Sequence, residues 1–164
     1  MQRPAGAANI RAPVHTTLLV LHVLAATVWV GGTVALVFVA VPYARTLEGP
    51  ARAEALAALG RRWRPLGWGA IGVLLATGSA MAADEDFFRG DSAARTVFLV
   101  KVCLAAVLIA AALLHDLVFG PRLAQQIREG RQQTARWRLV AVGWVSFATT
   151  IAVPVLGVVL AQLG

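Results

Sequence analysis

The sequence of 164 residues contains a single cysteine, a single lysine and only eight acidic residues. One cysteine cannot form a disulfide framework, so a disulfide-rich secreted scaffold is excluded. Charged residues make up 14% of the chain, whereas a soluble domain carries roughly 25%. Hydrophobic residues make up 59%. This composition excludes disorder and collagen, and it cannot supply the polar exterior of a soluble enzyme.

Four long apolar stretches account for this composition, at about 14–41, 66–83, 94–119 and 139–163. A helix needs about 20 apolar residues to cross a bilayer core of about 30 Å, and these stretches meet or approach that length. The sequence therefore predicts an all-α fold, an integral membrane four-helix bundle in which residues 1–164 form a single transmembrane domain. Residues 50–62 have alanines and leucines at helical spacing beside arginines, which predicts a short helix in the membrane interface. Residues 122–138 are predicted to be a polar, partly helical connection, and no internal repeat is apparent.

The arginines are distributed unevenly between the two sides that four crossings define. Ten lie in the loops at 43–65 and 116–138, and four lie on the side that holds both termini and the loop at 84–95, where four acidic residues offset them. Because arginine-rich loops stay in the cytoplasm, we expect both termini on the outer side of a bacterial cytoplasmic membrane. This bias also accounts for the formal charge of +7 without a nucleic-acid partner.

Ionisable residues inside apolar stretches are costly and therefore mark candidate functional positions. His15, His22 and Trp29 are spaced seven residues apart, so they share one face of the first helix. Imidazole, thioether and thiolate groups are ligands of copper ions, which predicts a copper site in the outer half of the bundle. Its candidate ligands are His22, His15, Met81 and Cys103, below a loop that holds Asp84 and Asp86.

Lys101 lies at a depth similar to that of His22, on a helix that runs in the same direction. A protonated lysine close to His22 would repel a cation. We therefore expect Lys101 either to point away from the site or to be the group that a neutral or anionic cofactor requires. The alternative to copper is a haem b bound by His22 alone, or by His22 together with Lys101 or His15. A structural or assembly subunit without a ligand is the third alternative.

His115 and Asp116 lie near the cytoplasmic end of the third helix, beside Arg122. His22 and His115 differ in depth by about twelve residues, or roughly 18 Å, which is too far for both to ligate one iron. We expect His115 and Asp116 to form a hydrogen-bonded pair that anchors the helix end. A proton or metal exit station is the alternative for this pair.

The segment Leu21–Leu36 (LHVLAATVWVGGTVAL) resembles the opening transmembrane motif of the CopD family of bacterial copper-resistance membrane proteins. Residues 76–81 (ATGSAM), the start of the Lys101 helix and residues 114–123 (LHDLVFGPRL) are similar to further patterns of that family. The resemblance implies copper import or handling rather than enzymatic activity. The partners that it implies are a copper ion, the lipid bilayer and a periplasmic copper-binding protein. A more distant similarity to HemJ-type membrane proteins, through His22, Lys101 and His115, implies haem b chemistry.

Overall fold

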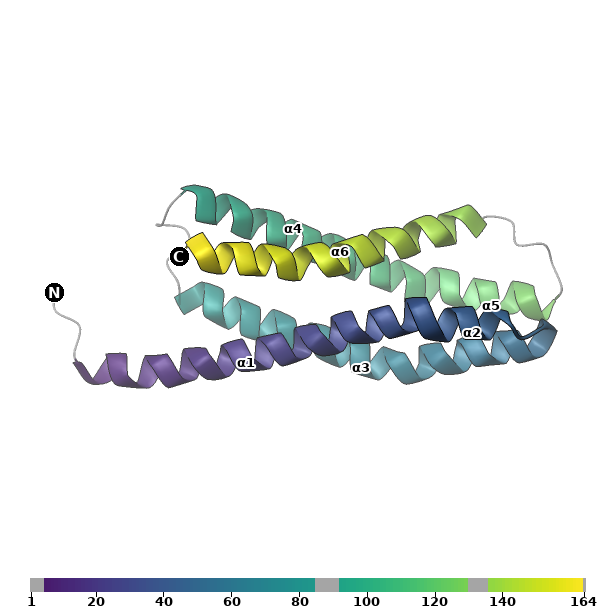
Figure 1. Ribbon diagram of the computed structural model, residues 1–164, viewed down its shortest axis with the longest axis horizontal. Helices are drawn as coiled ribbons and strands as arrows, with labels where there is room; N and C mark the ends of the chain where they lie inside the picture. Colours follow the sequence, from purple (N-terminus) through teal and green to yellow (C-terminus); the bar gives the residue numbers. More distant parts are fainter. Residues whose placement is uncertain (1–4, 85–91, 130–135, 164) are drawn as a thin grey trace.

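The computed structural model describes residues 5–84, 92–129 and 136–163, and every element within these ranges is a helix (Figure 1). The all-α fold predicted from the sequence is thereby confirmed. The elements, in which η marks a π-helical turn, are α1 (Ala5–Ala35), η1 (Leu36–Ala40), α2 (Val41–Arg45), α3 (Gly49–Asp84), α4 (Ser92–Leu114), η2 (His115–Phe119), α5 (Gly120–Arg128) and α6 (Arg136–Leu163).

Four helical segments are long and apolar enough to cross a membrane: Pro13–Arg45, Gly49–Ala83, Arg95–Arg122 and Ala141–Val159. Large apolar side chains on the outside of the bundle are exposed, among them Leu117 and Val158, as expected where the neighbour is lipid rather than water. Many buried positions hold small residues, such as Ala25, Ala70 and Ala111, which let membrane helices approach closely. The chain is therefore a multi-pass membrane protein.

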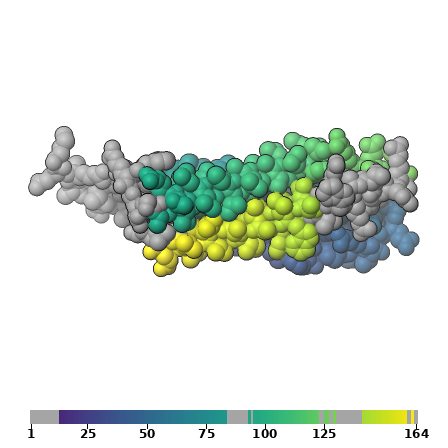
Figure 2. Space-filling model, turned by 90° about the horizontal axis from the view of Figure 1, so that it is seen from above, coloured from purple at the N-terminus to yellow at the C-terminus, as the bar shows by residue number. Residues whose placement is uncertain are grey.

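The long helices form two hairpins that lie side by side (Figure 1). α1 packs mainly on α3 and α4 mainly on α6, while contacts between the hairpins join α1 to α6 and α3 to α5. Figure 2 shows α4 and α6 running side by side along one face of the molecule. α1 begins and α6 ends at the same end of the bundle, which we call the terminal end. We call the opposite end the basic end because of its exposed arginines: Arg45, Arg61, Arg62, Arg64 and Arg122.

The first helix of each hairpin contains one π-helical turn close to the basic end. η1 is followed by Pro42 and η2 by Pro121. Proline has no N–H group, and its ring would clash with the carbonyl four residues earlier in a regular α-helix. In both helices that carbonyl belongs to the π-helical turn, so the wider turn accommodates the proline and the helix continues beyond it.

Residues 50–62 do not form a separate interfacial helix, because they belong to α3, a continuous helix of 36 residues. The segment is rich in alanine, leucine and arginine, which favour helix, and its Ala53 is fully buried, as is Ala44 of the neighbouring α2. Pro65 lies inside α3 without ending it. In the connection at 122–138, α5 continues as helix to Arg128, in agreement with the prediction of partial helix.

α1 and α3 interlock through two tryptophans and two glycines. The ring of Trp63 occupies the place of a side chain at Gly32, since a Cβ added there would overlap its six-membered ring. A Cβ added at Gly67 would lie 3.1 Å from Nε1 of Trp63 and 3.2 Å from Cζ3 of Trp29. The centroids of the two tryptophan rings are 6.0 Å apart, and the rings are tilted by 37°. The missing side chains at both glycines therefore allow α1 and α3 to approach closely.

Candidate functional site

His22 is part-buried within the first hairpin, where α1 meets α3. Its Nδ1 lies 2.8 Å from the hydroxyl oxygen of Thr77, and Thr77 is buried. The ring lies over Gly78, where an added Cβ would be 3.3 Å from Cε1 of His22. The imidazole thus has the hydrogen-bonding partner that a polar group within a membrane helix needs.

The hydrogen bonds of Thr77 indicate the tautomer of His22. The Thr77 hydroxyl lies 2.7 Å from the carbonyl of Val73, to which it donates. The tautomer with the proton on Nδ1 of His22 satisfies this hydrogen bond and the contact with Thr77 together, and in that tautomer Nε2 keeps a lone pair. Metal-bound histidines are commonly oriented by such a hydrogen bond from the other ring nitrogen. In this tautomer, the nitrogen that is left for a ligand is Nε2.

Lys101 is an ammonium group on α4, the first helix of the second hairpin, as His22 is an imidazole on the first helix of the first hairpin. Its side chain is partly buried, and Nζ lies against α6, 3.3 Å from where a Cβ added to Gly157 would be. The contact with Gly157 directs Lys101 toward α6, and its role toward a neutral or anionic cofactor stays a prediction. A neutral or anionic ligand suits this pair better than a bare cation does.

The other candidate copper ligands contribute less to this site. Cys103 is exposed on α4, and His15 and Met81 are partly buried nearer the terminal end. In the described ranges, no three histidine, cysteine, aspartate or glutamate residues lie close enough together to hold a metal ion. The side chain of Asp84 and the whole of Asp86 lie outside the described residues. The copper site therefore stays a prediction.

Trp29 lies two turns from His22 toward the basic end and links the two hairpins. Its Nε1 donates to the hydroxyl of Thr150 on α6 at 3.2 Å, and Thr150 is almost completely buried. The face shared by His22 and Trp29 is therefore directed into the bundle, toward α3 and α6.

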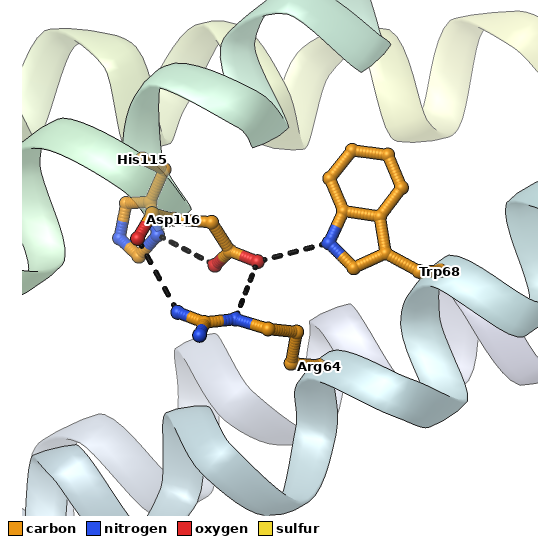
Figure 3. Close-up of polar contacts among 4 residues, drawn as sticks. All are labelled: Arg64, Trp68, His115 and Asp116. Atoms are coloured by element: carbon orange, nitrogen blue, oxygen red, sulfur yellow. Dashed lines mark hydrogen bonds and ion pairs between the residues drawn. The ribbon is translucent and has the colours of Figure 1, made fainter.

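Asp116 joins the second hairpin to the first nearer the basic end (Figure 3). Its Oδ2 accepts hydrogen bonds from Nε1 of Trp68 at 3.0 Å and from Nε of Arg64 at 3.2 Å. Nη2 of Arg64 also donates to the Asp116 carbonyl at 3.3 Å. Nδ1 of His115 lies 3.9 Å from Oδ1, and the His115 side chain is 54% exposed. The carboxylate thus ties η2 to α3 through Arg64, whereas sequence position had suggested Arg122 as the neighbouring arginine.

Replacing Asp116 with asparagine should lower the free energy of unfolding by about 1 kcal/mol, the value of a partly exposed ion pair. Asparagine keeps an acceptor for Trp68 but loses the charge that attracts Arg64, and both ion-pair partners are partly exposed. Thermal melting in detergent would measure the change, with Glu48→Gln as a control at an exposed acidic residue. Equal stability of the Asp116 variant and the unchanged protein would show that the ion pair does not help to hold the hairpins together.

Sequence reasoning missed the residues that position His22 and Asp116, namely Thr77, Gly78, Arg64 and Trp68. Thr77 and Gly78 lie within the ATGSAM stretch that carries part of the family resemblance, but their contact with His22 depends on how α1 aligns with α3. Arg64 contributes to the sequence analysis only as a loop charge. These partners become visible only once the helices are placed side by side.

No protein-family model matches the chain, and no curated protein or solved structure matches it either.

Proposed function

We propose that this membrane protein binds a haem b through His22, in the half of the bundle next to the terminal end, and takes part in electron transfer. The observation that carries the proposal is an imidazole held by a buried threonine, with a lysine on the first helix of the second hairpin. Nδ1 of His22 lies 2.8 Å from the Thr77 hydroxyl, and Nζ of Lys101 lies against Gly157 of α6. A haem presents an iron and two carboxylates, which suit an imidazole and an ammonium group respectively.

The residues around His22 fit a haem in their chemistry. Helical bundles hold cofactors with side chains from facing helices, and His22 and Lys101 come from the first helices of the two hairpins. His22 would ligate the iron, Thr77 would hold the imidazole in place, and Lys101 would offset carboxylate charge. Ala25, one turn from His22 on α1, is buried. When bound, the haem supplies one-electron chemistry.

We further propose that the terminal end faces outward from a bacterial cytoplasmic membrane. Exposed arginines gather at the basic end, and segments rich in arginine remain in the cytoplasm. Under this orientation, His22 and Lys101 lie in the outer half of the membrane. A reporter fused to the C-terminus should be active only if it functions outside the cytoplasm. Activity of a cytoplasmic reporter at that position would reverse the orientation.

Copper import or handling is the second candidate, and the position of Met81 favours it. Met81 follows Thr77 by four residues, so the two lie on one face of α3, and Met81 is partly buried. A thioether one turn beyond the partner of His22, together with that imidazole, would suit copper(I). The resemblance to the CopD family implies the same function. The charge of Lys101 opposes it, which is why haem ranks first.

One experiment separates the candidates: the absorption spectrum and metal content of the protein purified in detergent after expression with haem precursor and copper. We expect a Soret band and iron bound in a constant ratio to protein. Bound copper without a Soret band would replace the haem proposal by the copper one. Absence of both would overturn both proposals and leave the structural alternative.

A further inference from the structure

The first helix of each hairpin contains the same backbone feature, which is a π-helical turn followed by a proline. The π-helical turns begin at Leu36 and His115, which are 79 residues apart. The prolines that follow them, Pro42 and Pro121, have the same separation. In each turn the backbone N–H of the residue after it donates to the carbonyl of the first residue of the turn. The first helices of the two hairpins therefore share a π-helical turn and a proline at equivalent positions.

The same separation relates the polar residues of the candidate site. His22 and Lys101 are 79 residues apart, and so are Gly78 and Gly157. His22 lies over Gly78, and Lys101 lies over Gly157. A Cβ added to either glycine would come within 3.3 Å of the side chain above it. In each hairpin, one ionisable side chain of the first helix thus contacts a glycine of the second helix.

If residues with this separation are equivalent, α1 corresponds to α4 and α3 corresponds to α6. The contacts between the hairpins agree with this correspondence. α1 contacts α6, and α5, which continues the α4 helix, contacts α3. Each first helix therefore packs on the second helix of the other hairpin. α1 and α4 also run in the same direction, from the terminal end to the basic end (Figure 1). An approximate two-fold axis along the bundle relates such parallel repeats.

We infer that the chain is a tandem repeat of one helix hairpin, with His22 and Lys101 at the same position of the two repeats, and that the ligand site lies on the approximate two-fold axis between them. The ligand part of this inference rests on the proposed function, whereas the equivalence of the two positions does not. A ligand on the axis meets both hairpins at one depth, an arrangement that suits a flat ring of approximately two-fold shape such as a porphyrin. Each repeat supplies one nitrogen group to it.

If positions 22 and 101 are equivalent, exchanging their residues should preserve the site. His22→Lys alone would place two ammonium groups near each other within the bundle, where like charges destabilise. Adding Lys101→His restores one imidazole and one ammonium. Since the position equivalent to Thr77 is Leu156, the complete exchange also includes Thr77→Leu and Leu156→Thr, which gives the transferred imidazole a hydroxyl partner.

Melting temperatures in detergent, with and without added haem, and the Soret band would test the inference. We expect His22→Lys to lower the melting temperature by about 3 °C or more and the complete exchange to recover most of that loss. The exchanged protein should also regain the Soret band that His22→Lys loses. Lys101→His alone, with two imidazoles and no repulsion, should remain folded and serves as the reference if His22→Lys does not fold.

Two results would overturn the inference. The first is a melting temperature of His22→Lys equal to that of the unchanged protein, which would mean that the two positions do not face each other. The second is a complete exchange that is no more stable than His22→Lys. The same measurements test the proposed function independently of the repeat. Recovery of stability without a Soret band in the unchanged protein would support the repeat and reject haem. A Soret band in the unchanged protein, without recovery in the exchange, would support haem and reject the repeat.

Discussion

In the His22→Ala variant, the Soret band of bound haem should disappear, because the variant lacks the nitrogen that ligates the iron. Loss of a residue that only orients a metal ligand typically lowers affinity by about 10–100-fold, and loss of the ligand itself should exceed that. The variant should still fold, since the Thr77 hydroxyl keeps the Val73 carbonyl as its acceptor. Titration with haem, followed by absorption, would measure the change.

Two further variants identify the cause of such a loss. Thr77→Val keeps the imidazole but removes the group that orients it, so haem affinity should fall by about 10–100-fold. His15→Ala changes a partly buried histidine two turns away on the same helix, and it should weaken binding less than His22→Ala does. Wild-type haem affinity in His22→Ala would rule out His22 as the ligand, and loss of copper instead of haem would favour the second candidate.

Gly32→Ala should be the most destabilising single-methyl change in the first hairpin. The added Cβ would overlap the six-membered ring of Trp63, and this ring is confined by Gly67 and Trp29. Overpacking of this kind typically costs about 1–3 kcal/mol. We expect the upper end of that range because an indole ring is rigid. Thermal melting in detergent would measure the loss.

The neighbouring glycine provides the matched control. A Cβ added at Gly31 meets nothing within 4 Å, so Gly31→Ala should leave the melting temperature almost unchanged. Adding Trp63→Phe to Gly32→Ala replaces the indole by a smaller ring and should recover part of the loss. Equal effects of the two glycine substitutions would mean that helix propensity, rather than the contact with Trp63, determines the result.

The sequence predicts the fold class well because apolar runs of membrane length allow few alternatives. It does not predict where helices continue past the apolar runs. α3 begins at Gly49, well before the apolar stretch at about 66, because its polar part has helix-forming residues and packs on α2. The π-helical turns were not predicted either, although the prolines that accompany them are visible in the sequence.

Within the site, the seven-residue spacing of His22 and Trp29 is enough to place both on one face. Their partners Thr77 and Thr150 lie on other helices, and no local pattern relates residues that are 55 and 121 positions apart. The repeat is hidden for a different reason. Equivalent positions hold residues of different chemistry, such as His22 and Lys101, and the shared prolines and glycines are too common to mark a repeat without the structure.

The interlock of Trp63 with Gly32 and Gly67 determines how this bundle can move. A ring that fills the space of absent side chains opposes sliding of α1 past α3, so we expect the first hairpin to move as a rigid body. Two hydrogen-bonded links to the second hairpin, through Trp29 and Asp116, lie on the basic side of His22. We expect these two links to hold the hairpins together at that level during such a motion, so that the basic half of the bundle changes least.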